Sequence, residues 1–448
     1  MTTWFCDYAV LPSGVARHVR ITVEGDRIVE VVKRAKRAEG DTHLRGVTLP
    51  GAANGHSHAF HRALRGRTHG EGGNFWTWRN QMYAVTERLT PQTYRALARA
   101  VFAEMVLAGY TVVGEFHYLH HAPGGLPYED PNAMGLALVD AAREAGIRIT
   151  LLDACYLAGG LFASGHEPLD AVQQRFSDGS VEVWAQRVGR LTPTETARFG
   201  AAIHSVRAVP RDSLGPIAAT ARAGVGSVPG PMPLHLHLSE QPGENVACQT
   251  HYGCTPSELI AAEGVLGPMT TVVHATHLTD HDIELLGEAQ VTACFCPTTE
   301  RDLADGIGPA RELTEHGVRL SLGSDQHAVI DPFEEVRGVE MNERLRSLER
   351  GRFEIPDLLD MACAHGYASL GWPEGGRLVE GHLADFVTVR LDSARTAGCG
   401  PDQVGYAATS ADVTDVVIGG EHLVQRGVHR LGDVGELLQE ALSQVRAP

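Results

Sequence analysis

The chain has 448 residues, a length that fits one large domain or two to three ordinary ones. Hydrophobic residues make up 43% and charged residues 21% of it, which excludes a disordered or fibrous protein. With 38 basic and 55 acidic side chains the formal net charge is −17, so nucleic acid is not an expected partner. We find neither a membrane-helix pattern nor a signal-peptide pattern, and we expect a cytoplasmic protein that does not bind membranes.

Two residue types restrict the chemistry further. The chain contains only two lysines, Lys33 and Lys36, so it has no lysine for a P-loop or for a Schiff base in a catalytic domain. Its eight cysteines are scattered without a CxxC pair, which argues against a disulfide framework and against a zinc finger. We expect most of them to be small buried apolar residues.

The N-terminal residues predict a β-hairpin. Residues 19–23 and 28–32 have strand character and flank Glu24-Gly25-Asp26, which is a typical turn sequence.

Short apolar runs rich in β-forming residues then recur along the middle of the chain, each followed by enough residues for a helix. Residues 94–107 have helical periodicity, and Gly109 is placed to end that helix. Eight such units predict an α/β protein with a (β/α)8 TIM barrel. The predicted strands are residues 46–51, 111–116, 148–154, 201–206, 234–238, 271–275, 291–296 and 318–323.

Strand character returns near the C-terminus, at residues 386–389 and 413–418. We therefore expect a small β-sandwich domain built from both termini, residues 1–47 and 376–448. The TIM-barrel catalytic domain, residues 48–375, would be inserted between its two parts.

Active sites of TIM barrels lie at the C-terminal ends of the strands, and histidines recur there in this sequence. Two histidines that are two residues apart on an extended segment point the same way, so His56 and His58 can bind one ion. His237 and Asp325 could complete the set, and these nitrogen and oxygen ligands suit Zn²⁺, with Fe²⁺ as second choice. The segments concerned are Asn54-Gly55-His56-Ser57-His58, His235-Leu236-His237, His274-Ala275-Thr276-His277 and Ser324-Asp325-Gln326-His327.

This pattern resembles the amidohydrolase superfamily, whose barrel binds metal through HxH after strand one, histidines after strands five and six, and an aspartate after strand eight. Residues 376–386 (GRLVEGHLADF) look like that superfamily's return from barrel to sandwich, and the resemblance covers nearly the whole chain. It implies one metal ion per chain, because the dinuclear members use a carbamylated lysine after strand four, which is absent here. It also implies a homodimer.

Within the superfamily the chain is similar to the deiminases that act on N-formimidoyl-L-glutamate in histidine degradation. The likeness implies hydrolysis of the HN=CH–NH– group to N-formyl-L-glutamate and ammonia. One position departs from that family, since His61 stands where the family has glutamine. The segments that carry the likeness are residues 54–65 (NGHSHAFHRALR), 75–79 (FWTWR), 114–121 (GEFHYLHH), 204–207 (HSVR), 235–241 (HLHLSEQ), 274–278 (HATHL), 296–300 (CPTTE) and 323–327 (GSDQH).

The resemblance assigns a role to each residue around the metal. Asp325 would accept the proton of the attacking water, Glu240 would protonate the imine nitrogen, and His274 would hydrogen-bond the tetrahedral centre. The dicarboxylate substrate matches guanidinium groups. The expected substrate-binding residues are His61, Arg79, Tyr118, His204 and Arg207.

Two other functions stay open. A related aminohydrolase acting on guanine, cytosine or a triazine would use the same metal and acid groups. A non-catalytic binding protein with this fold is the third possibility, although such relatives usually lose metal ligands. The histidines of residues 116–121 also resemble a second metal cluster, but for His120 and His121 we expect strand-end and surface positions.

Overall fold

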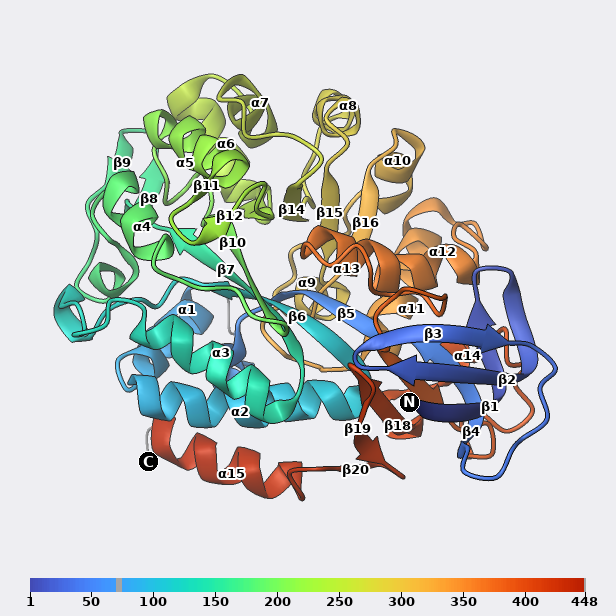
Figure 1. Ribbon diagram of the computed structural model, residues 1–448. Coiled ribbons are helices and arrows are strands. Elements are labelled where there is room, and N and C mark those ends of the chain that lie inside the picture. The colour runs from blue at the N-terminus through green and yellow to red at the C-terminus, as the bar shows by residue number, and fades with distance from the viewer. Residues whose placement is uncertain (70–74, 447–448) are drawn as a thin grey trace.

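The structure, a computed structural model, describes residues 1–69 and 75–446 and contains a parallel barrel beside a second sheet (Figure 1). A parallel bridge between Ser57 and Asp325 joins the first barrel strand to the segment after the last one. The sheet thus closes, which confirms the predicted TIM barrel. Its strands are β5 (Ala52–Ser57), β6 (Tyr110–His117), β7 (Arg148–Cys155), β10 (Ala197–Ile203), β13 (Leu234–Leu238), β14 (Thr270–His274), β15 (Thr292–Phe295) and β16 (Arg319–Leu322).

Seven of the eight predicted barrel strands overlap the observed ones, and the first prediction is wrong. Residues 46–50 belong to β4 (Thr42–Pro50), which lies in the other sheet. The first barrel strand is β5, whose sequence AANGHS has little β propensity. It is a strand because it pairs with β6 and is buried along its whole length.

Helices surround the barrel between its strands (Figure 1). The first long one, α2, begins after the capping residue Thr90 and ends at Gly109, whose φ of 104° only glycine adopts readily. This confirms the predicted helix and its end. The main helices are α1 (Phe75–Thr86), α2 (Pro91–Ala108), α3 (Ala133–Ala145), α4 (Val181–Val188), α5 (Arg211–Ala223), α6 (Pro242–Tyr252), α7 (Pro256–Ala262), α8 (Asp280–Glu288), α9 (Pro297–Asp302), α10 (Ala310–Glu315), α11 (Pro332–Ser347), α12 (Ile355–Asp360) and α13 (Gly366–Ser369).

Both ends of the chain form the second sheet, as predicted. Its strand order is β20-β19-β18-β17-β4-β1-β2-β3, and the antiparallel β4–β17 pair joins the N-terminal part to the C-terminal part. The last helix, α15 (Val434–Val445), packs against α2 of the barrel. The domain boundaries at residues 47/48 and 375/376 stay a prediction. The remaining strands are β1 (Thr2–Leu11), β2 (Gly14–Glu24), β3 (Arg27–Val32), β17 (Phe386–Val389), β18 (Val413–Ile418), β19 (Glu421–Gln425) and β20 (Val428–His429).

Two further observations bear on the sequence predictions. Six of the eight cysteines are buried and all eight are free thiols, which confirms their reading as packing residues. Among the described residues, no helix has both the length and the apolar character needed to cross a membrane.

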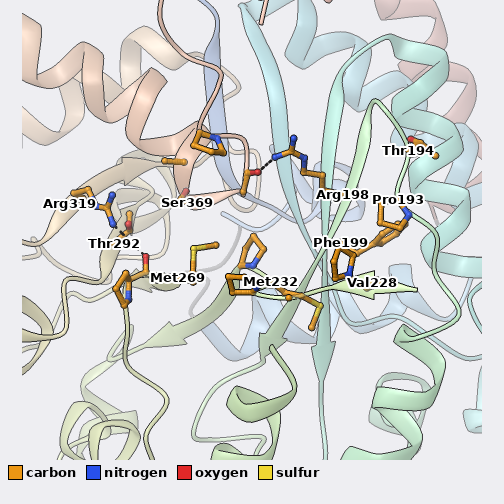
Figure 2. A pocket seen from close by; sticks show the side chains of 18 residues that line it. Pro193, Thr194, Arg198, Phe199, Val228, Met232, Met269, Thr292, Arg319 and Ser369 are labelled. Carbon is orange, nitrogen blue, oxygen red and sulfur yellow. Dashed lines mark hydrogen bonds between the residues drawn. The ribbon is translucent and has the colours of Figure 1, made fainter. Parts of the chain in front are cut away.

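A cavity of about 520 Å³ lies at the N-terminal ends of the barrel strands (Figure 2). Thr292 and Arg319, at the starts of β15 and β16, are among its lining residues. Arg198 at its edge donates a hydrogen bond to the carbonyl of Gly371 and lies 3.8 Å from the centre of the Trp372 ring. This cavity is therefore at the end of the barrel opposite to the predicted metal ligands.

Candidate active site

The four predicted metal ligands meet at the C-terminal end of the barrel. His56 lies near the end of β5 and His58 directly after it, His237 lies on β13, and Asp325 lies in the segment after β16. His237 Nε2 lies 3.2 Å from His56 Nε2 and 3.4 Å from His58 Nε2. Asp325 Oδ1 lies 3.4 Å from both His56 Nε2 and His58 Nε2. The nitrogens of His56, His58 and His237 form one group of ligand atoms within 4.8 Å of one another, and Asp325 belongs to two further such groups, with His56 and His274 and with His58 and His61.

Backbone carbonyls fix which nitrogen two of these histidines present. His58 Nδ1 lies 2.9 Å from the carbonyl oxygen of Phe116, and His237 Nδ1 lies 2.8 Å from that of His204. A carbonyl can only accept, so each Nδ1 carries the proton of its neutral ring and each Nε2 has a free lone pair. The two Nε2 atoms therefore face each other without a proton between them. This arrangement suits a cation and fits the residues to one divalent metal ion.

Burial keeps the three histidines in the neutral state that a metal needs. Desolvation, together with the neighbouring histidines, holds the pKa values of His56 and His58 well below the usual value. Burial likewise lowers the pKa of His237 to about 3, so all three rings are neutral near pH 7. Burial raises the pKa of Asp325 to about 7, and a bound cation would reverse that shift because it favours the carboxylate.

Glu240 and His274 stand beside this set. His274 Nε2 lies 3.9 Å from Glu240 Oε1 and 3.9 Å from Asp325 Oδ2. Arg207 donates to Glu240 Oε2 at 2.9 Å, and its Nε lies 3.2 Å from Glu244 Oε2. Burial alone would raise the pKa of Glu240, but the charges of Arg207 and the neighbouring histidines, together with the hydrogen bond from Arg207, outweigh burial and lower the pKa to about 2.

Sequence reasoning gave no role to Glu300, although its segment was part of the resemblance. Glu300 Oε1 accepts a hydrogen bond from the Cys296 backbone at 2.8 Å and lies 3.4 Å from His274 Nδ1. Burial lowers the pKa of His274, but the contact with Glu300 and the charges of Glu240 and Asp325 raise it to about 10. The sequence does not reveal this role, because Glu300 and His274 are brought together only by the fold.

The five predicted substrate-binding residues line one cavity of about 550 Å³ together with His58, His237 and Asp325. His61 Nε2 lies 3.0 Å from the hydroxyl of Tyr118, and Arg79 Nε donates to the hydroxyl of Tyr83 at 2.7 Å. His204 and Arg207 lie on the wall formed after β10. The structure thus brings these side chains together, and their roles stay predictions.

Backbone strain marks the same end of the barrel. Non-glycine residues with positive φ follow or end three strands: Ser239 after β13, His274 and Ala275 at the end of β14, and Asp325 and His327 after β16. Such conformations cost of order 1–3 kcal/mol each and persist where the surrounding structure imposes them. Their clustering points to a functional site at these strand ends.

The expected surface position of His120 and His121 is wrong, because both are buried. His121 Nε2 lies 3.1 Å from Asp178 Oδ1, and Arg187 binds both Asp178 and Asp153. His117, His120 and Asp153 also place three ligand atoms within 4.8 Å of one another, as a metal site would need.

Comparisons with known proteins agree with this geometry. The sequence pattern of the amidohydrolase family matches residues 47–423. The chain is 34% identical to the formimidoylglutamate deiminase of Pseudomonas aeruginosa, over 96% of each chain. It is 28% identical to a 5-methylthioadenosine/S-adenosylhomocysteine deaminase of Natronomonas pharaonis, over 92% of this chain and 90% of the other. An amidohydrolase structure from Brucella melitensis superimposes with a TM-score of 0.90 at 31% identity, covering 100% of both chains.

The family pattern matches most of the chain, and the barrel strand ends carry the HxH pair, a further histidine and the aspartate. The chain therefore belongs to the amidohydrolase family.

Proposed function

We propose that this chain is a metal-dependent deiminase that hydrolyses N-formimidoyl-L-glutamate to N-formyl-L-glutamate and ammonia. The likeness to the Pseudomonas aeruginosa enzyme over nearly the full length of both chains carries this proposal. The arginines and histidines that line the cavity support it, because they suit a small substrate with carboxylates. A cytoplasmic homodimer and a place in histidine degradation are parts of the same proposal.

His56, His58, His237 and Asp325 would hold the metal ion, Zn²⁺ by ligand type and Fe²⁺ as the alternative. When bound, such an ion lowers the pKa of water so that a nucleophile is available near neutral pH.

The chain's own groups would move the protons. Asp325 would accept one proton of the attacking water. Glu240, which is ionised in the resting site, would take up a proton before it protonates the imine nitrogen, and the second proton of the water would complete the departing ammonia. His274, which lies 3.9 Å from both carboxylates, hydrogen-bonds the tetrahedral centre. Arg207 orients Glu240 through their 2.9 Å contact. Arg207 also lines the cavity, and it would bind the glutamyl part of the substrate together with Arg79, Tyr118, His204 and His61.

The test is ammonia release by zinc-loaded protein, with one metal per chain confirmed beforehand. N-formimidoyl-L-glutamate is the substrate, and guanine and cytosine are the controls. We expect ammonia from the first compound alone. Release from a ring compound alone would replace this proposal by a ring aminohydrolase, and a protein that binds no metal would favour a non-catalytic role.

A further inference from the structure

The short turn that presents Asp325 has a strained backbone. Asp325 has a φ of 39° and His327 a φ of 61°, values that residues other than glycine seldom adopt. The His327 N–H bonds to the Ser324 carbonyl at 2.8 Å and closes the turn, which we call the Asp325 turn (residues 324–327). Strained conformations persist only where the surrounding structure imposes them, so contacts around this turn hold it in place.

The ring of His327 supplies two of these contacts. Its Nδ1 lies 2.9 Å from the Ser324 hydroxyl at the start of the turn, and its Nε2 lies 3.2 Å from the Ser57 hydroxyl. Ser57 stands between His56 and His58 in the sequence and ends β5. The ring therefore connects the Asp325 turn to the segment that carries two other proposed metal ligands. It is completely buried and does not line the active-site cavity.

The two hydroxyls that the ring contacts are also held from their other sides. The Ser57 hydroxyl donates to Glu115 Oε2 at 2.5 Å. Asn54 Nδ2 donates to the Ser324 hydroxyl at 2.7 Å, and Asn54 Oδ1 accepts from the Ser324 N–H at 2.9 Å. A chain of hydrogen bonds thus runs from Glu115 through His327 to Asn54.

Donors and acceptors match along this chain. Because Ser57 donates to the Glu115 carboxylate, its oxygen accepts from His327 Nε2. A neutral imidazole has one donor nitrogen, so His327 Nδ1 accepts from the Ser324 hydroxyl, whose oxygen accepts from the Asn54 amide. All five side chains are buried. Removing one of them would leave its neighbours with unsatisfied polar groups away from water.

Backbone hydrogen bonds cross the same junction between β5 and the Asp325 turn. The N–H groups of Ser324 and Asp325 bond to the His56 carbonyl at 3.2 and 3.0 Å, and the His58 N–H bonds to the Asp325 carbonyl at 3.1 Å. The junction thus determines where Asp325 Oδ1 lies, 3.4 Å from Nε2 of both histidines. A shift of the turn would move this oxygen away from the nitrogens, and metal sites tolerate little misplacement of a ligand.

We propose that His327 is a positioning residue for the metal: its ring holds the Asp325 turn against β5 and thereby sets the affinity of the site for a divalent ion. The inference rests on the proposed ligand set and adds to it a residue that neither binds the ion nor touches the substrate. Glu115, through Ser57, and Asn54, through Ser324, support the ring from its two sides.

The test measures zinc affinity by competition with a chromophoric chelator, so it needs no turnover. In His327→Leu both hydrogen bonds of the ring are lost, and we expect the zinc dissociation constant to rise about 10- to 100-fold. His327→Gln keeps a donor that can reach Ser57 and should lose less affinity. Ser57→Ala removes the same contact from the other side and should also weaken zinc binding. Circular dichroism checks that each variant is folded.

His429→Leu is the matched control. His429 is also buried, with Nε2 3.1 Å from the Ala145 carbonyl and Nδ1 accepting from the Leu431 N–H at 3.0 Å, but it lies in the terminal sheet. Its loss should destabilise the fold to a similar degree and change the zinc dissociation constant by less than about twofold.

Hydrogen exchange followed by mass spectrometry tests the turn in the metal-free protein. His327→Leu should speed exchange in peptides that cover residues 323–327 severalfold, whereas His429→Leu should not.

The outcomes separate this inference from the proposed function. Unchanged zinc affinity in both His327→Leu and Ser57→Ala, or an equal loss in His429→Leu, would overturn the inference and leave the deiminase proposal intact. Zinc binding that depends on His327, with no ammonia from N-formimidoyl-L-glutamate, would support the inference and overturn the deiminase proposal. A folded, unaltered protein without affinity for zinc would overturn both.

Discussion

His235 and His237 are two residues apart on β13, but they lie in different surroundings. His237 presents Nε2 to His56 and His58, whereas His235 Nε2 is bonded to the carbonyl of Ser369 at 3.0 Å and does not line the cavity. The sequence predicts His237 as the metal ligand, although the alternation of side chains alone does not separate the two histidines, because both have the same parity. The structure separates them through their hydrogen bonds.

We expect His237→Ala to lose the bound metal and the turnover, because it removes a nitrogen from the set of four ligands. His235→Ala is the matched control, and it should keep one metal per chain even if the fold is less stable. Metal content is measured by elemental analysis after dialysis against trace chelator. Equal metal in both variants would contradict the proposed ligand set.

Glu300 allows a test of the group behind His274. Glu300→Gln keeps an acceptor for the Cys296 N–H but removes the negative charge 3.4 Å from His274 Nδ1. We expect kcat to fall roughly 10- to 100-fold, as is typical when a supporting partner is lost, while metal content stays at one per chain.

The control for that experiment is Asp302→Asn on the same helix, whose carboxylate contacts Gln326 and His69 instead. It should change kcat by less than about twofold, in line with a group that has no contact with His274. The kcat of both variants is measured by steady-state kinetics at saturating N-formimidoyl-L-glutamate. An unchanged kcat in Glu300→Gln would show that Glu300 does not support His274 in catalysis.

At the scale of elements, the C-terminal end of α2 shows how one residue closes a helix. Gly109 has φ of 104°, and a Cβ built there would meet Val387 and Val413 at an ordinary 3.6 Å. The cost of Gly109→Ala is therefore conformational, about 1–2 kcal/mol of unfolding free energy. Gly267→Ala, where the space around the Cβ is open and φ is not positive, should change stability by less than about 0.5 kcal/mol. Urea unfolding of both variants checks this, and equal midpoints would refute the assignment.

The elements also show where sequence reasoning succeeds and where it fails. Helix α2 was predictable because its periodicity and its glycine stop agree, and strand β17 because it is rich in β-branched residues. Strand β13 was predictable because leucine and histidine alternate along it. The first barrel strand was not, because the apolar residues precede it in β4 and the strand itself carries the small and polar residues of the metal site. Likewise, the backbone carbonyls of Phe116 and His204 fix the tautomers of His58 and His237. The sequence does not predict these contacts, because every residue has a backbone carbonyl.

At the scale of the whole molecule, one buried ion pair connects the barrel to the terminal sheet. Arg148 begins β7 and donates to Asp385, just before β17, at 2.8 and 3.3 Å. The Tyr367 hydroxyl and the Gly419 backbone N–H each donate to the same carboxylate at 2.7 Å. Because both charges are buried, removing one partner leaves the other uncompensated.

We therefore expect Arg148→Met to lower the free energy of unfolding by about 3–5 kcal/mol. Arg143→Met is the matched control, since its pair with Asp140 is exposed and contributes about 0–1 kcal/mol. Combining Arg148→Met with Asp385→Asn should cost less than the sum of the two single changes, because the double variant leaves no buried charge unpaired. Guanidinium unfolding, followed by tryptophan fluorescence and by circular dichroism, measures the four variants and the unaltered protein. If Arg148→Met shifted the unfolding midpoint no more than Arg143→Met, then the contact between the barrel and the terminal sheet would depend on apolar packing rather than on this ion pair.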